Sequence, residues 1–311
     1  MSTTEAFLVL QETPVTGKTP PLRIAAAMQA ASLSSQTVNA YLQCETHALA
    51  LELIDSPGTY RIVRTTCKSR WCLRCSQRRA HTIRDNLEPI IADRTIRMIT
   101  LTIKHNDAPL PEQLDRLIRA FRKLRSLVNW RDRVRGGVYF LELTRNQDTQ
   151  TWHPHLHLLC EGKYYDVYDL SRDWLRSSGD SHVVHITLVR DKRAIEAYVT
   201  KYLTKPLNST LYADEHALAD AMSALHGRRT VGAFGSWTRY KLLSPNDRPP
   251  VRLVGWLAEL RLRAYNGDQL AAHLVAVYDD MPDDTMSIDT TIPPIVIGRL
   301  DALDVPSTCG P

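Results

Sequence analysis

The chain has 311 residues, 43% of them hydrophobic, and a formal net charge of +5, so we expect one large or two smaller domains with a sizeable core. No amino-terminal segment joins a cationic start to an apolar core, and no apolar run approaches the roughly 20 residues of a membrane span, so we expect a cytoplasmic protein without a membrane partner. The charge is uneven, because residues 61–135 hold 19 Lys and Arg against 7 Asp and Glu, and this block predicts a polyanionic partner such as nucleic acid.

The two ends of the chain predict little packed structure. Residues 1–40 are rich in Ser, Thr, Ala and Pro and should form a flexible arm with one short helix near Leu22–Ala31. Residues 276–311 hold one Arg against seven Asp, together with several prolines, a composition typical of a disordered acidic tail. We therefore expect the folded part of the chain between these two segments.

Residues 41–95 contain a cluster of cysteines. The last two cysteines of this cluster are separated by two residues, the spacing that lets two thiolates bind one tetrahedral zinc ion. A site with four thiolates would use Cys44, Cys67, Cys72 and Cys75. His47 could replace either of the first two. Clustered cysteines in a cytoplasmic protein indicate metal ligation before disulfides, so we predict a small module held together by a structural Zn²⁺.

Basic side chains surround these cysteines, with Trp71 among them. The arginines that we assign to DNA contact are Arg70, Arg74, Arg78 and Arg79. A zinc-stabilised module that presents arginines and an aromatic ring suits contact with DNA, although some of these side chains will simply be solvated. Residues 41–95 are therefore predicted to be a basic zinc-binding module.

From residue 96 onward, strand and helix patterns alternate. The predicted elements are a strand over 97–103, a helix over 111–128, a strand over 138–144, a strand that begins at 152, a helix over 164–177, a strand over 182–189 and a helix over 192–205. Gly136 and Gly137 are expected to turn the chain into the second strand, and 146–150 is expected to be a polar turn. In the helix over 164–177 we expect Trp174 and Leu175 to pack inward.

The strand that begins at Trp152 places three histidines, at 153, 155 and 157, at every second position. Side chains at this spacing share one face of a strand, so two of these imidazoles can bind one divalent ion. If the strands 138–144 and 152–159 form a hairpin, Glu142 lies nearly opposite His155 and could be a third ligand. Otherwise Glu142 is a surface charge beside the histidines.

The helix over 192–205 carries two tyrosines one turn apart, Tyr198 and Tyr202, on the same face. Lys201 and Lys205 each follow a tyrosine by three residues. An isolated pair of this kind would usually be packing residues. Further on, residues 207–275 predict a helix over 212–226, a basic loop broken by glycines over 228–237 and a short helix over 253–264.

Three motifs in this order resemble those of the rolling-circle replication initiators of plasmids and phages, which belong to the HUH endonuclease superfamily. Residues 99–102 resemble the first motif, 153–157 the second, and 198–205 the third, in a two-tyrosine form similar to the gene A proteins of phiX-type phages. Residues 67–75 also resemble the cysteine segment that precedes the nuclease in many plasmid initiators. The resemblance covers about residues 44–240.

This resemblance implies an α+β fold, with a central antiparallel sheet of about five strands flanked by helices, similar to ferredoxin and RRM folds. The metal histidines would lie on a central strand, and the tyrosine helix would lie across the site. The expected domains are a flexible arm over 1–40, the zinc-binding module over 41–95, the nuclease core over 96–206, a helical and basic region over 207–275 and an acidic tail over 276–311.

The resemblance also implies a metal-dependent single-strand DNA endonuclease and strand transferase. A Mg²⁺ or Mn²⁺ ion would bind His155, His157 and Glu142. Tyr202 would be the first nucleophile and would form a 5′-phosphotyrosyl enzyme, Tyr198 would be the second, and Lys201 or Lys205 would activate the tyrosine or neutralise phosphate. The expected partners are single-stranded or supercoiled origin DNA, a host helicase and a host DNA polymerase.

Other functions remain open at this stage. A relaxase or a transposase of the same superfamily fits the same motifs. The histidine strand alone also resembles the histidine-triad nucleotide hydrolases, in which His155 would be the nucleophile. The cysteines and arginines alone fit a zinc-dependent DNA-binding regulator without catalysis.

Overall fold

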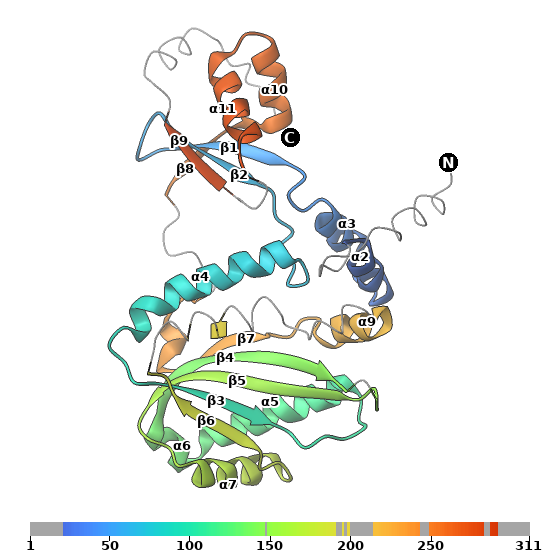
Figure 1. Ribbon diagram of the computed structural model, residues 1–311, viewed down its shortest axis with the longest axis vertical. Helices are drawn as coiled ribbons and strands as arrows, with labels where there is room; N and C mark the ends of the chain where they lie inside the picture. The colour runs from blue at the N-terminus through green and yellow to red at the C-terminus, as the bar shows by residue number, and fades with distance from the viewer. Residues whose placement is uncertain are drawn as a thin grey trace, which may run out of the picture. The chain divides into compact units, whose positions relative to one another are not determined.

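The computed structural model describes residues 21–146, 148–190, 195, 198–199, 214–242, 249–282 and 287–291. The chain divides into two compact units, and each has an antiparallel sheet of its own (Figure 1). The first unit comprises residues up to 38 and 68–246, and the second comprises residues 39–67 and those from 247 onward. The expected α+β class is confirmed.

The first unit is built on a five-stranded sheet with the order β6-β3-β5-β4-β7. Its strands are β3 (Ile96–Thr102), β4 (Val134–Arg145), β5 (Trp152–Gly162), β6 (Val184–Leu188) and β7 (Val231–Gly235). The predicted polar turn joins β4 to β5, and the histidine strand β5 is the middle strand, as expected. Because β5 pairs with β3 on one side and with β4 on the other, residues of both strands lie beside His155 and His157, whereas His153 pairs with Thr144 of β4.

Helices cover both faces of this sheet (Figure 1). The helices of this unit are α2 (Pro21–Ala30), which packs on α9 rather than on the sheet, α4 (Leu73–Ile91), α5 (Leu110–Ser126), α6 (Val128–Arg133), α7 (Val167–Ser178), α9 (Glu215–Ala224) and the 3₁₀ helix η2 (Ser236–Arg239). On the histidine face, Ile83 and Leu87 of α4 pack in one core with Phe140 and Leu159. On the other face, Phe121 of α5 meets the ring of Tyr139 edge-on. Neighbouring residues of β4 therefore belong to two different cores, as the pleat requires.

Gly136 and Gly137 do not form the predicted turn but lie within β4. A Cβ on Gly137 would lie 2.1 Å from the carbonyl oxygen of Leu159, so only glycine permits the close approach of β4 and β5 at this point. In α7, Trp174 packs inward as predicted and is fully buried, but Leu175 does not, since it is 42% exposed.

The second unit contains a four-stranded sheet with the order β8-β1-β2-β9. Its elements are β1 (Ala48–Leu53), β2 (Thr59–Arg64), β8 (Val251–Trp256), α10 (Leu257–Tyr265), α11 (Gln269–Asp279) and β9 (Ser287–Thr291). The side chains of Ala50, Ile62, Leu260 and Leu274 form its core. These pairings join segments about 200 residues apart, so residues 41–95 do not form one separate module.

Two further expectations change. The short helix near Leu22–Ala31 is confirmed as α2, but Ile24, Ala27 and Met28 are buried, and α3 (Ser35–Leu42) follows. The helices α2 and α3 therefore replace the expected flexible arm, because each buries apolar side chains on one face. The strand β9 lies within the segment that was predicted to be a disordered tail.

Candidate active site

The middle strand β5 brings its histidines beside polar residues of both neighbouring strands. His155 pairs with Thr102 of β3 and with Glu142 of β4, so the predicted position of Glu142 opposite His155 is confirmed. His157 pairs with Thr100 on the β3 side. Polar groups from three strands therefore gather on one face of the sheet.

Hydrogen bonds fix the orientation of both imidazoles. The Thr100 Oγ1 lies 3.1 Å from His157 Nδ1, and the Thr102 Oγ1 lies 3.1 Å from His155 Nδ1. At the other ring nitrogen, His157 Nε2 lies 2.6 Å from Glu142 Oε2. Both Nδ1 atoms thus face threonines of β3, and both Nε2 atoms are turned toward β4, where Thr144 lies 3.3 Å from His155.

The two histidines are largely buried, and burial determines the protonation state of His155. His157 is only 6% exposed. Burial lowers the pKa of His155 to about 4, although the carboxylate of Glu142 acts in the opposite direction. His155 is therefore neutral near pH 7, which is the form in which an imidazole can donate its lone pair to a metal ion.

Two imidazole nitrogens and one carboxylate are a donor set that suits Mn²⁺, and Mg²⁺ where phosphate oxygens complete the coordination. The carboxylate of Glu142 contacts His157 rather than His155, and the ring centroids of the two histidines lie 6.4 Å apart. The residue types therefore suit a divalent ion, with His155 as the third ligand two positions before His157 on the same face, although the three ligand atoms do not all lie within 4.8 Å of one another in this structure.

Tyr198 is the one tyrosine of the predicted pair that the structure describes. Its ring lies edge-on to His157 at 6.0 Å and to Phe140 at 6.4 Å, measured between ring centroids. With Ile195 and Val199, which are buried against the same core, it belongs to helical backbone. Tyr202, Lys201 and Lys205 lie outside the described residues.

His153, the first histidine of the motif, has a different partner. Its ring stacks on that of His105 at 4.3 Å, and burial together with His105 lowers the pKa of His153. Sequence reasoning did not single out His105, because it lies in a loop after β3 and no periodicity links it to β5. Alternation along β3 could have placed Thr100 and Thr102 on one face, but not beside the histidines.

The four predicted zinc ligands do come together. The sulfur atoms of Cys44, Cys67, Cys72 and Cys75 all lie within 4.8 Å of one another, and no other group of potential ligands in the described parts of the chain meets this condition. A tetrahedral zinc with Zn–S bonds of about 2.3 Å places its sulfurs about 3.8 Å apart. The cluster therefore fits Zn²⁺, and Cys44 rather than His47 belongs to it.

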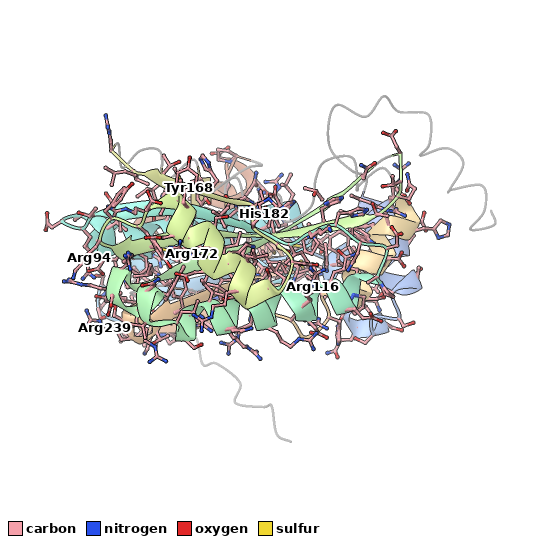
Figure 2. The ribbon with its side chains drawn as sticks, turned by 90° about the horizontal axis from the view of Figure 1, so that it is seen from below. Arg94, Arg116, Tyr168, Arg172, His182 and Arg239 are labelled. Carbon is pink, nitrogen blue, oxygen red and sulfur yellow. The ribbon has the colours of Figure 1, made fainter. Side chains whose placement is uncertain are left out.

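The arginines predicted to contact DNA are partly engaged within the fold. Arg70 donates a hydrogen bond to the carbonyl of Arg228, and burial lowers its pKa, while Arg79 donates to the carbonyl of Lys68. The other two, Arg74 and Arg78, are half-buried on α4. Further guanidinium groups gather elsewhere: Arg94 and Arg239, at one end of the sheet in Figure 2, both donate to the hydroxyl of Tyr240.

Comparison with known proteins gives the following matches. Residues 62–255, more than half of the chain, match the family model Rep_1, described as "Replication protein". A "Protein rep" of Streptococcus pneumoniae serotype 2 (strain D39 / NCTC 7466) is 24% identical over 201 residues, which cover 54% of this chain and 60% of that protein. A "Protein rep" of Bacillus amyloliquefaciens is 31% identical over 104 residues, 31% of each chain. The chain thus spans less than two thirds of the length of these relatives, and no solved structure gives a significant match.

No helix in the described ranges is long and apolar enough to cross a bilayer.

Proposed function

The chain belongs to the Rep_1 family of replication proteins, and we propose on this premise that it nicks the origin of a plasmid or phage replicon and starts rolling-circle replication through a 5′-phosphotyrosyl intermediate. One observation carries the proposal. The middle strand holds a neutral imidazole and an imidazole–carboxylate pair beneath a helix from which Tyr198 reaches His157.

The chain's own residues prepare this site for a scissile phosphate. A Mg²⁺ or Mn²⁺ ion held by His155, His157 and Glu142 would act as a Lewis acid on the phosphoryl oxygens. With a metal ion on the Nε2 atoms, Thr100 and Thr102 would accept the Nδ1 protons and so hold both Nε2 lone pairs on the side of β4. The burial of His157 strengthens its interaction with the carboxylate of Glu142 relative to the same contact in water.

The nucleophile is a tyrosine oxygen. We assign the first cleavage to Tyr202, whose oxygen forms a bond to phosphorus while the bond to the 3′-oxygen breaks, and the leaving oxygen takes up a proton to become a 3′-hydroxyl that a host polymerase can extend. Tyr198 would attack the regenerated origin at the end of a round. Lys201 or Lys205 would neutralise charge on the phosphate.

The remaining features supply DNA binding. The cysteine cluster would hold a structural Zn²⁺ and fix the start of α4, which carries Arg74 and Arg78. The names of the matched relatives support an initiator of the Rep type, for which the expected partners are origin DNA, a host helicase and a host polymerase. The likeness to phiX-type gene A proteins rests on the two tyrosines alone.

The test is to incubate the full chain with a single-stranded origin oligonucleotide and Mn²⁺, with EDTA as the control. We expect a covalent complex that survives denaturing electrophoresis. A label at the 3′ end should move with the protein, and a label at the 5′ end should leave with the fragment that carries the free 3′-hydroxyl. Absence of the complex, or a reversed pattern of labels, would exclude the proposed polarity of cleavage.

A further inference from the structure

The sheet face opposite the histidines carries a cavity of about 640 Å³. It lies between α5, strand β4 and the loop before β7, and Tyr139 and Phe121 contribute aromatic rings to it. Five arginines line the same cavity: Arg119, Arg122, Arg125, Arg228 and Arg229. Tyr139 precedes Phe140 on β4, so it points away from the face that carries the histidines.

The positive charge of this cavity is largely uncompensated. The one carboxylate in its lining, that of Asp115, pairs with Arg228. In the part of the chain that the structure describes, the other four arginines form no ion pair. By contrast, Arg116 on α5 and Arg172 on α7, both labelled in Figure 2, pair with aspartates. Four unpaired guanidinium groups in one concave site create a field that attracts an anion.

Arg125 gives a second and independent sign of a ligand. Its guanidinium lies 4.8 Å from the ring centroid of Phe121 and 5.8 Å from that of Phe234, which holds the side chain in place. Its Nε is buried without a hydrogen-bond partner, and burial lowers its pKa. A buried polar atom without a partner is costly, and an anion in the cavity would remove part of that cost.

The aromatic floor favours one kind of anion. The half-buried phenol of Tyr139 lies across from Gly232, where a Cβ would come within 2.7 Å of the ring, so glycine at this position leaves the ring its space. Aromatic rings among arginines are typical of sites for single-stranded nucleic acid, because unpaired bases stack on the ring while the phosphates meet the guanidinium groups.

We propose that this arginine cavity binds a segment of single-stranded DNA, separate from the strand that is cleaved on the histidine face. The anion site follows from the cavity itself, whereas the choice of DNA rests on the proposed function. A chain that holds two segments at once keeps a displaced strand close to the site that must later rejoin it.

The test uses the full chain in EDTA and compares the number of short single-stranded oligonucleotides, of about ten residues, bound per chain. The variant is Arg122→Ala/Arg229→Ala, and the control is Arg131→Ala/Arg176→Ala, which removes the same charge from exposed positions on α6 and α7. We expect the variant to bind one oligonucleotide fewer than wild type and control. The salt dependence of log K for the lost site should correspond to about 0.7 per phosphate.

Equal stoichiometry in variant and control would overturn the proposal. Tighter binding of RNA or duplex DNA of the same length to the cavity would overturn the choice of single-stranded DNA, and saturation by thymidine monophosphate would reduce the site to one for a free nucleotide. Adduct formation on the origin oligonucleotide should be unchanged in the variant. If neither wild type nor the two variants form the adduct, but the Arg122→Ala/Arg229→Ala variant still binds one oligonucleotide fewer than the others, the result would count against the proposed function and not against the cavity.

Discussion

Replacing Thr100 by valine should weaken metal binding at the histidine site without disturbing the fold. Valine keeps the β-branched shape that suits strand β3 but has no hydroxyl to meet His157 Nδ1, which lies 3.1 Å away. In the metal-free protein the threonine can donate to that nitrogen, and with metal on Nε2 it can accept the Nδ1 proton. Thr100→Val removes both possibilities at a histidine that is 6% exposed.

The size of the effect follows from that burial. A buried polar atom that loses its partner costs about 1–3 kcal/mol, and partners of this kind typically change metal affinity by about 10- to 100-fold. We therefore expect Thr100→Val to weaken Mn²⁺ binding by roughly tenfold, measured by calorimetry or by the electron paramagnetic resonance of free Mn²⁺. Thr100→Ser keeps the hydroxyl and should restore most of the affinity.

A matched control lies on the neighbouring strand. Thr187 of β6 contacts His185 Nε2 at 2.8 Å, but both residues are exposed and lie outside the proposed metal ligands. Thr187→Val should leave Mn²⁺ affinity unchanged. Equal affinity of wild type and Thr100→Val, or an equal loss in Thr187→Val, would refute the orienting role of Thr100, provided that the melting temperatures of the three proteins agree.

Three further predictions concern the histidines and the cysteines. His157→Ala should abolish cleavage while single-stranded DNA binding survives. His153→Ala should reduce cleavage less, because His153 stacks on His105. Cleavage and binding assays on both variants measure these effects. Because the pKa of His155 is about 4, its imidazole should stay neutral at pH 5.5, where an ordinary imidazole with a pKa near 6.5 would be about 90% protonated. This can be read from the NMR shifts of its ring in the metal-free protein, and a His155 that is protonated at pH 5.5 would contradict it. Cys75→Ser should lose zinc, measured by elemental analysis, and unfold the neighbouring segment, since structural zinc contributes on the order of 10 kcal/mol in small modules.

The histidine face could be predicted because its signals are local. Alternation along β5 places three histidines on one face, and the short connection to β4 sets the register that puts Glu142 opposite His155. Hairpin geometry needs only a few residues of sequence, so this part of the site was within reach.

The residues of β3 that contact the histidines of β5 could not be predicted from the sequence. Thr100 and His157 are 57 residues apart, and nothing in the sequence states which strand lies beside β5. The same reason explains the missed second unit, where β1 pairs with β8 across about 200 residues. The turn predicted at Gly136 and Gly137 was wrong because glycine occurs both in turns and where two strands approach closely. Only the position of the Leu159 carbonyl beside Gly137 distinguishes the two cases, and the sequence does not give it.

The most direct test of the account is to identify the amino acid that carries the DNA. The covalent complex would be digested and its DNA-linked peptide mapped by mass spectrometry in wild type, Tyr198→Phe and Tyr202→Phe. We predict that Tyr202 carries the DNA in wild type and in Tyr198→Phe, which should nick once but fail to complete a round, and that Tyr202→Phe loses most of the first cleavage. DNA attached outside these two tyrosines, or an adduct that persists when both are phenylalanine, would contradict the account.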